Sequence, residues 1–309
     1  MDGVKVFAPA SVANIAVGYD ILGLALDQPG DDVIINEGNT PGIKITEIRG
    51  AKGKLPYEIE KNTAGYSAMR LLQHLGKTDL PIHMEIHKKM KLGTGMGSSA
   101  ASAVAGVYGI NEYLGCPLSK AELLRFAVEG EQIADGAFHA DNVAPSLLGG
   151  LVLIRDNESL DFKKIHVPQG LCVTMIYPYI KILTRDSRAV LKETVPLSTV
   201  IKQTGNLASF IAGMFTSDFD LIRNSLQDLM IEPQRAHLIP YFYEIKNNAL
   251  NHGALGFSIS GAGPSMFALC QNTMDAENIL NSSLALLKDR DVKCDCFISN
   301  INLEGAYKY

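Results

Sequence analysis

The glycine-rich segment at residues 91–101 (Lys-Leu-Gly-Thr-Gly-Met-Gly-Ser-Ser-Ala-Ala) constrains this chain more than any other stretch. Three glycines alternate with other residues, two serines follow them, and small helix-favouring residues come next. Glycine allows positive φ and a close approach of the backbone to a ligand. The unpaired N–H groups and the dipole at the start of a helix attract anions. The segment therefore predicts a loop that binds phosphate groups at a helix N-terminus.

Two better-known glycine loops do not fit this segment. A P-loop needs a lysine directly before the Ser/Thr, whereas Gly97 precedes Ser98 here. The dinucleotide fingerprint G-x-G-x-x-G has a different spacing and follows a hydrophobic strand, whereas basic residues at 87–91 precede this loop. A plain flexible loop before a packing helix is the remaining alternative, and the doubled serine argues against it.

The overall composition excludes several classes of protein. The chain has 309 residues, 47% of them hydrophobic, which is enough for a sizeable core in two domains or one large one. A formal net charge of −5 argues against a general nucleic-acid-binding surface. The start of the chain has no signal-peptide pattern, and no apolar run approaches the roughly 20 residues that span a bilayer. We expect neither nucleic acid nor membrane as a partner.

The cysteines indicate a reducing compartment. Their number is five and their spacing is irregular, which fits free thiols in a cytoplasmic protein. Cys294 and Cys296 flank Asp295, but no second Cys/His pair completes a set of four metal ligands. We expect an idle thiol pair on a strand at 292–298.

Hydrophobic periodicity and turn signals predict a mixed α+β chain without strict βα alternation. The expected strands cover residues 4–8, 32–36, 43–48, 82–87, 151–154, 171–177, 254–260, 265–270 and 292–298. The expected helices cover residues 62–75, 98–114, 119–134, 142–147, 185–192, 198–215, 219–229, 240–251 and 274–287. Residues 10–23 are expected to form a polar, glycine-containing loop. The division is expected at residues 1–165 and 166–309.

Four further clusters of polar residues can carry chemistry. They are residues 8–20 with Asn14 and Asp20; Glu129 and Glu131 near a helix end; His139, Asp141 and Asn142; and the arginine sites at 184–188 and 232–235. A carboxylate at a helix C-terminus is unfavourable unless a cation offsets it, so Glu131 suits Mg²⁺. The guanidinium groups of Arg188 and Arg235 can hold a carboxylate in fork geometry. Taken singly, these clusters also fit a surface turn, exposed acids, a helix cap and surface ion pairs.

These segments, in this order, resemble the galactokinase, homoserine kinase, mevalonate kinase and phosphomevalonate kinase (GHMP) superfamily. The match includes the core of its glycine loop at 93–101 and its C-terminal glycine motif at 256–265. The segments at 8–20, 139–145, 188–191 and 232–235 look like the homoserine kinase branch. The resemblance runs from the first strand to about residue 265.

The resemblance implies a fold, a reaction and a set of partners. The N-terminal, ATP-binding domain would be like the second domain of ribosomal protein S5, and the C-terminal domain would be ferredoxin-like. Nucleotide and substrate would bind between them. The implied reaction is ATP-dependent phosphorylation of L-homoserine to O-phospho-L-homoserine, a step toward threonine. ATP and Mg²⁺ would be the cofactors, and a homodimer is common in the family.

The residue roles follow from this resemblance. The phosphates would lie on Lys91, Gly93, Thr94, Gly95, Met96, Gly97, Ser98 and Ser99. Ser98, Ser99 and Glu131 would hold Mg²⁺, with the serine that contacts it left open. Homoserine would lie among Asn14, Asp20, His139, Asp141, Asn142, Thr184, Arg188 and Arg235. Asp141 and Asn142 are the expected catalytic residues, with Asp141 accepting or orienting the hydroxyl proton.

Lys91 and Met96 depart from the family pattern, which has Pro and Leu there, but they leave the glycines and serines intact. Lys91 is expected to add charge near the phosphates. The segment 8–13 lacks the basic residue that mevalonate-kinase-like members pair with a catalytic Asp. Two alternatives stay open. One is a related kinase acting on a mevalonate-like or sugar substrate, and the other is a silent metabolite-sensing relative.

Overall fold

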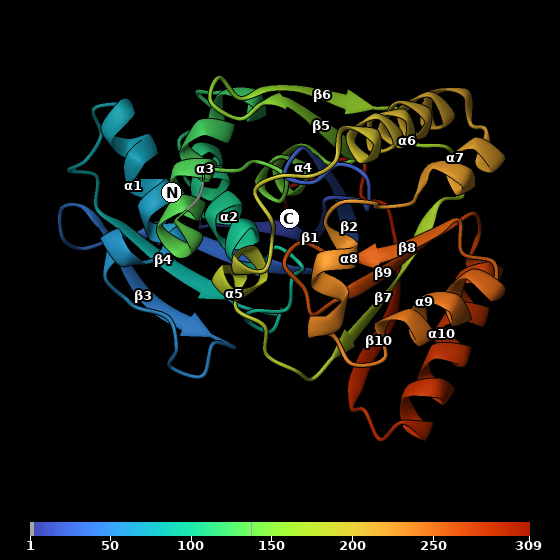
Figure 1. Ribbon diagram of the computed structural model, residues 1–309. Helices are drawn as coiled ribbons and strands as arrows, with labels where there is room; N and C mark the ends of the chain where they lie inside the picture. Colours follow the sequence, from blue (N-terminus) through green and yellow to red (C-terminus); the bar gives the residue numbers. More distant parts are fainter. Residues whose placement is uncertain (1–2, 137) are drawn as a thin grey trace.

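Two β-sheets organise the chain, and helices cover their faces (Figure 1). The structure is a computed structural model, and it describes residues 3–136 and 138–309. Strands and helices do not alternate regularly along the chain, so the α+β class expected from the sequence is confirmed.

The first sheet has seven strands and carries the N-terminal half of the chain. Its strands are β1 (Val4–Ala13), β2 (Leu22–Glu37), β3 (Ile43–Arg49), β4 (Ile82–His87), β5 (Leu151–Asp156), β6 (Asp161–Ile165) and β11 (Tyr307–Lys308). The order is β11-β1-β2-β4-β3, and the hairpin β5–β6 pairs with the other end of β2. Only β3 and β4 run parallel among the described pairs. Ile82, Met84 and Ile86 alternate with more exposed residues, so β4 turns one face to the core.

Three helices pack on this sheet and a fourth packs on those three, with the helix after the glycine loop at their centre. They are α1 (Thr63–His74), α2 (Ser98–Tyr113), α3 (Lys120–Asp135) and α4 (Val143–Leu148). Nearly every residue of α2 is buried, because α1, α3, α4 and the sheet surround it. At Gly106 a Cβ atom would lie 2.2 Å from the carbonyl oxygen of Ala64, so glycine permits the close contact between α1 and α2.

The second sheet is antiparallel and belongs to the C-terminal half. Its order is β10-β7-β9-β8, with β7 (Cys172–Pro178), β8 (Gly256–Ile259), β9 (Met266–Cys270) and β10 (Cys294–Asn300). The helices of this half are α5 (Thr184–Ala189), α6 (Leu197–Thr216), α7 (Phe219–Ser225), α8 (Glu232–Arg235), α9 (Phe242–Asn251) and α10 (Thr273–Asp289). Short 3₁₀ turns lie at Ile59–Lys61 and Ala236–Leu238. One face of the sheet packs with α9 and α10, and the other joins the larger core.

The main error of the sequence prediction lies at the start of the chain. The expected strand at 4–8 continues to Ala13, so the expected loop at 10–23 is reduced to residues 14–21. Strand β2 begins at Leu22 and runs for 16 residues, far beyond the expected 32–36. Pairing of Ser11, Val12 and Ala13 with β2 overrides the local turn signals, and a register shift between Pro9 and Ser11 accommodates the bend. Strands β6 and β11 and helix α8 were not expected.

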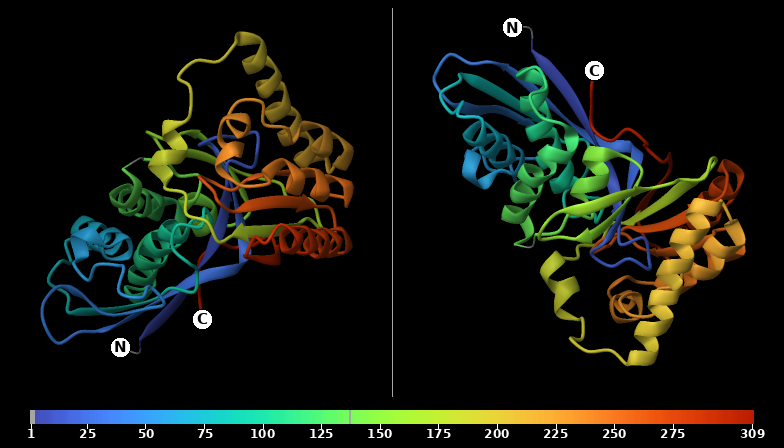
Figure 2. Two further views of the ribbon diagram at one scale, coloured as in Figure 1. Left: turned by 60° about the horizontal axis from the view of Figure 1, so that its bottom comes forward. Right: turned by 90° about the horizontal axis from the view of Figure 1, so that it is seen from above.

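The end of the chain returns to the first sheet (Figure 2). Strand β11 pairs with β1, and Ile301 forms a bridge with Leu26. The Lys120 ammonium group donates to the backbone oxygens of Glu304 and Ala306, at 2.7 and 2.6 Å. We propose a domain division at 165/166, with residues 301–309 joined to the first domain.

The cysteines are free thiols, as expected. The sulfur atoms of Cys294 and Cys296 lie 3.8 Å apart. The Asp295 side chain between them in the sequence does not join this thiol pair but accepts a hydrogen bond from Lys91. Within the described residues, no helix is both long enough and apolar enough to cross a membrane.

Candidate active site

The glycine loop has the backbone conformation that its sequence suggests. Gly93, Gly95 and Gly97 have φ of 70°, 79° and 66°, and α2 begins directly after Gly97. A Cβ atom at Gly97 would lie 2.3 Å from Ser11 Oγ, and one at Gly95 would lie 2.6 Å from the Ser260 carbonyl oxygen. Glycine is therefore required at both positions for steric as well as conformational reasons. The N-terminus of α2 has no side-chain cap, so its N–H groups remain oriented toward the loop.

Both halves of the chain hold this loop in place. Ser260 Oγ donates to the Gly95 carbonyl oxygen at 2.7 Å, and the Ser265 N–H donates to the Thr94 carbonyl oxygen at 3.1 Å. From β1, the Ser11 N–H donates to the Met96 carbonyl oxygen at 3.1 Å. The loop consequently has its shape only where the two halves meet.

A buried ion pair between Lys88 and Asp31 connects the entry of the glycine loop to α2. The Lys88 ammonium group pairs with Asp31, and it donates to the Ser98 carbonyl oxygen at 2.6 Å and to Ser102 Oγ at 2.7 Å. The other oxygen of Asp31 accepts from the backbone N–H groups of Lys89 and Met90. Both side chains are almost completely buried. This network fixes the entry of the loop to the first turn of α2, and no motif in the sequence marks it.

A cavity of about 300 Å³ opens in front of the loop. The expected site residues that line it are Asn14, Asp20, Gly93, Thr94, Gly95, Gly97, Ser98, Ser99, Glu131, His139, Asp141, Asn142, Thr184, Arg188 and Arg235. Residues not singled out for the site also line it: Tyr19, Leu55, Leu92, Ala134, Ile182, Gly261, Ala262 and Gly263. Segments that are far apart in the sequence thus form one site between the domains.

Lys91 and Met96 do not line this cavity. The Lys91 ammonium group lies 2.6 Å from a carboxylate oxygen of Asp295, and it also lies 3.9 Å from the ring centre of Tyr179. The hydrogen bond with Asp295 raises the pKa of Lys91 to about 12. The side chain of Met96 is buried in the core. Lys91 therefore connects the loop entry to β10 and β7 of the other half.

Hard oxygen donors gather where α2 begins. Ser99 Oγ donates to Glu131 Oε1 at 2.6 Å, so the end of α3 faces the start of α2. Ser98 Oγ is buried and has no hydrogen-bond partner among the described residues. Hydroxyl and carboxylate oxygens are the ligands that Mg²⁺ prefers, so this donor set fits the ion.

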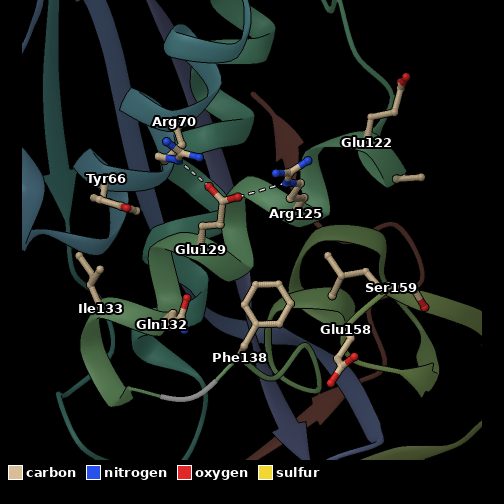
Figure 3. Close-up of a pocket in the computed structure, with 12 residues that line it drawn as sticks. Tyr66, Arg70, Glu122, Arg125, Glu129, Gln132, Ile133, Phe138, Glu158 and Ser159 are labelled. Carbon is tan, nitrogen blue, oxygen red and sulfur yellow. Dashed lines mark hydrogen bonds and ion pairs between the residues drawn. The ribbon is translucent and has the colours of Figure 1, made fainter.

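The neighbouring acid of α3, Glu129, faces a different hollow (Figure 3). Its carboxylate lies between the guanidinium groups of Arg70 and Arg125, with distances of 2.6 and 3.1 Å. This hollow is larger, about 810 Å³, but neither the glycine loop nor an expected site residue lines it. Its central carboxylate is already paired with two guanidinium groups, so we place the chemistry in the cavity at the glycine loop.

A left-handed turn after β1 positions the acidic side of the cavity. Asn14, Ile15 and Ala16 have φ of 72°, 40° and 57°, and Asp20 has φ of 60°. Non-glycine residues adopt this conformation at a cost, so the contacts around them must enforce it. Asn14 Oδ1 accepts from the Asp20 N–H at 3.0 Å, and Asn14 Nδ2 donates to the Gly261 carbonyl oxygen at 3.1 Å.

The Asp20 carboxylate lies opposite basic groups. Both of its oxygens accept from Arg188, each at 3.1 Å, and His139 Nε2 lies 3.7 Å from Asp20 Oδ2. Arg235 is more buried, and it donates to the carbonyl oxygens of Ser187 and Gly261, at 2.9 and 3.2 Å. Burial lowers the pKa of Arg235, but a guanidinium group keeps its charge in proteins. One wall of the cavity therefore presents two cations and one anion.

Asp141 and Asn142 also line the cavity, and Asn142 lies next to Gly97 of the glycine loop. Asp141 is buried and precedes α4, and Asn142 Oδ1 accepts from Ser11 Oγ at 2.9 Å. Strand β2 passes close behind, since a Cβ atom at Gly23 would collide with the carbonyl oxygen of Asp141. The backbone at Asp141 is therefore fixed.

The fold and this site define a small-molecule kinase, and comparisons with known proteins agree. The family models "GHMP kinases N terminal domain" and "GHMP kinases C terminal" match residues 62–150 and 207–283. A homoserine kinase of Chlorobium phaeobacteroides is 42% identical, with 99% of each chain covered. A homoserine kinase of Xylella fastidiosa is 42% identical over 88% of this chain and 84% of its own length. The crystal structure of homoserine kinase from Cytophaga hutchinsonii has a TM-score of 0.97 at 45% identity, covering 100% of this chain and 98% of that one.

More distant structures share the fold. L. major mevalonate kinase in complex with R-mevalonate has a TM-score of 0.72 at 19% identity, with 96% of each chain covered. The chain belongs to the GHMP kinase family, in its homoserine kinase branch. The family and the two-domain fold inferred from the sequence motifs are thus confirmed.

Proposed function

We propose that this protein transfers the γ-phosphoryl group of ATP to the hydroxyl group of L-homoserine, forming O-phospho-L-homoserine for threonine biosynthesis. One observation carries the proposal beyond family membership. A single cavity presents an anion-binding glycine loop on one side and the Asp20, Arg188 and Arg235 charges on the other. The full-length homoserine kinase relatives support the same substrate.

The loop would bind the phosphates of ATP through its backbone. Its glycines leave the N–H groups open to the cavity, and α2 points its positive dipole end at the same place. Phosphoryl transfer depends mainly on positioning and charge neutralisation, so a rigid loop is itself a catalytic device. Its hydrogen bonds to Ser11, Ser260 and Ser265 supply that rigidity.

Ser98, Ser99 and Glu131 would hold Mg²⁺ beside the phosphates. When bound, the ion neutralises charge on the β- and γ-phosphate oxygens. Glu131 keeps its carboxylate at the end of α3, where the helix dipole disfavours it, and Ser99 orients that carboxylate by hydrogen bonding. Two hydroxyl groups and a carboxylate form the hard-oxygen donor set that Mg²⁺ prefers, which supports the assignment.

Homoserine would bind as a zwitterion among the charged groups. Its carboxylate suits Arg188 and Arg235, and its ammonium group suits Asp20, with Asn14, His139 and Thr184 completing the lining. In the structure Asp20 and Arg188 face each other. A zwitterion that enters between them gives each residue a new counter-charge, whereas a lone carboxylate leaves Asp20 without one. The pair therefore favours an amino acid over mevalonate or a neutral sugar.

Asp141 and Asn142 would act on the acceptor hydroxyl group. Asp141 lines the cavity and would accept or orient the hydroxyl proton, while Asn142, which contacts Ser11, would position the group. A loose transition state needs little help from a strong base, so orientation is the larger part of this role.

A coupled assay of ADP release tests the proposal. Homoserine, mevalonate and galactose are offered separately, with ATP and Mg²⁺ at saturating concentration. We expect turnover with homoserine only. Turnover with mevalonate or galactose instead identifies another GHMP-type kinase, and no turnover with any of them identifies a silent sensing relative.

We also propose that the enzyme is a cytoplasmic homodimer. Helix α6 presents Leu197, Ile201 and Phe215 to solvent at 74%, 64% and 56% exposure, and it carries a single charged residue, Lys202. Large apolar patches of this kind mark interaction surfaces. Sedimentation velocity tests this proposal. We expect the wild type to sediment as a dimer and Ile201→Lys, which puts a charge on the α6 surface, as a monomer. A monomeric wild type refutes the dimer.

A further inference from the structure

The Tyr19 hydroxyl group bonds both arginines of the cavity. Tyr19 lies in the turn between β1 and β2, directly before Asp20, and its side chain is half-buried. Its hydroxyl oxygen accepts from Arg188 Nη1 at 3.0 Å and from Arg235 Nη2 at 3.2 Å. The two guanidinium carbons lie 5.8 and 5.0 Å from the centre of its ring.

The two arginines reach the cavity from separate elements. Arg188 lies on α5 and Arg235 on α8, and each has its own anchors: Asp20 for the first, and the Ser187 and Gly261 carbonyl oxygens for the second. Two cations that converge on one point repel each other. The oxygen and the electron-rich ring face of Tyr19 lie between them and offset this repulsion. One phenol therefore sets the separation of both guanidinium groups.

The O–H group of Tyr19 can also donate a hydrogen bond. Its oxygen is the acceptor in both bonds with the arginines, so neither bond uses the O–H group. Burial and the neighbouring Asp20 raise the pKa of Tyr19, so the hydroxyl group stays protonated at neutral pH. Tyr19 lines the same cavity as the two arginines.

We propose that Tyr19 is a positioning residue that fixes the spacing of Arg188 and Arg235 and donates a hydrogen bond from its O–H group to the carboxylate of the amino-acid substrate. This inference rests on the proposed function, since it needs a carboxylate at the arginines. It predicts that the hydroxyl group contributes to recognition of the carboxylate and not to transfer of the phosphoryl group.

Tyr19→Phe tests this inference, because the ring and its packing remain. We expect the KM for homoserine to rise about 10-fold with kcat changed less than 2-fold, as for the loss of hydrogen bonds to charged groups. Tyr309→Phe is the matched control. It removes a hydroxyl group that donates to Asp32, neither residue lines the cavity, and it should change neither constant.

Two inhibitors separate recognition of the carboxylate from a general loss of structure. L-2-Aminobutyrate keeps the carboxylate of homoserine but lacks its hydroxyl group, and 3-aminopropan-1-ol lacks the carboxylate. Tyr19→Phe should weaken inhibition by the first about 10-fold and leave the second unchanged. An unchanged KM, or equal weakening of both inhibitors, overturns the inference. A wild type that does not phosphorylate homoserine overturns the proposed function instead.

Discussion

Alanine at Gly95 should damage the protein far more than alanine at Gly93, although both glycines belong to one loop. Both have similar positive φ, 79° and 70°, so the backbone strain of an alanine is comparable, about 1–2 kcal/mol at each. A Cβ atom at Gly93 meets nothing within 4 Å. A Cβ atom at Gly95 would lie 2.6 Å from the Ser260 carbonyl oxygen and 2.8 Å from that of Gly263. Of these two glycines, only Gly95 lies close against the C-terminal half of the chain.

The magnitude follows from the bonds that this contact would break. To relieve the clash, the loop must move away from residues 260–263, and Ser260 Oγ loses its 2.7 Å bond with Gly95. The neighbouring bond from the Ser265 N–H to the Thr94 carbonyl oxygen is stretched with it. At about 1 kcal/mol per hydrogen bond, Gly95→Ala should cost about 2 kcal/mol more than Gly93→Ala.

Urea unfolding of both variants, followed by circular dichroism, measures the difference. Gly93→Ala is the control, because it carries the strain without the clash. We expect a clearly lower midpoint for Gly95→Ala, and a weaker affinity for ATP even under conditions where that variant is folded. Equal midpoints for the two variants would refute the contact between the glycine loop and the C-terminal turn.

Four further outcomes follow from the site. Asp141→Asn should lower kcat about 100-fold if the carboxylate handles the proton, and an unchanged kcat removes that role. Arg235→Ala should raise the KM for homoserine about 10-fold or more, from a loss of roughly 1.5–3 kcal/mol, whereas an unchanged KM contradicts the carboxylate clamp. Glu131→Gln should raise the Mg²⁺ concentration for half-maximal rate by about 10-fold or more, and an unaltered Mg²⁺ titration would speak against its place at the ion. Lys91→Met breaks an exposed pair with Asp295, so it should cost at most about 1 kcal/mol of stability and leave the KM for ATP within about 2-fold, and a large rise in that KM would show that its charge acts on the phosphates.

Helices and their caps could be predicted from the sequence because their signals are local. Asn62 caps α1 by accepting from the Ala64 and Gly65 N–H groups, and Ser119 with Glu122 forms a capping box on α3. The strands were harder. The extension of β1 to Ala13 depends on pairing with β2, and the pairing of β11 with β1 joins the two ends of the sequence. No local pattern encodes such partners.

The site could be predicted in part for the same reason. Residues with characteristic chemistry, such as Asp141 and Arg235, were found from their motifs, and the structure brings them into one cavity. Tyr19 was passed over, because an aromatic ring beside Gly18 and Asp20 does not differ in sequence from an ordinary core residue. Lys88 likewise gave no signal among its basic neighbours, since its importance lies in its burial beside Asp31.

The pairing of β11 with β1 also fixes an order of events in the life of the protein. The ribosome synthesises β1 about 300 residues before β11, so this edge of the first sheet stays uncovered until residues 307–308 have been made. An unpaired strand edge is a template for association with other chains. The bonds from Lys120 to the Glu304 and Ala306 carbonyl oxygens then hold the late segment in place. The nascent chain therefore needs residues 301–309 to complete the domain whose first strand it made about 300 residues earlier.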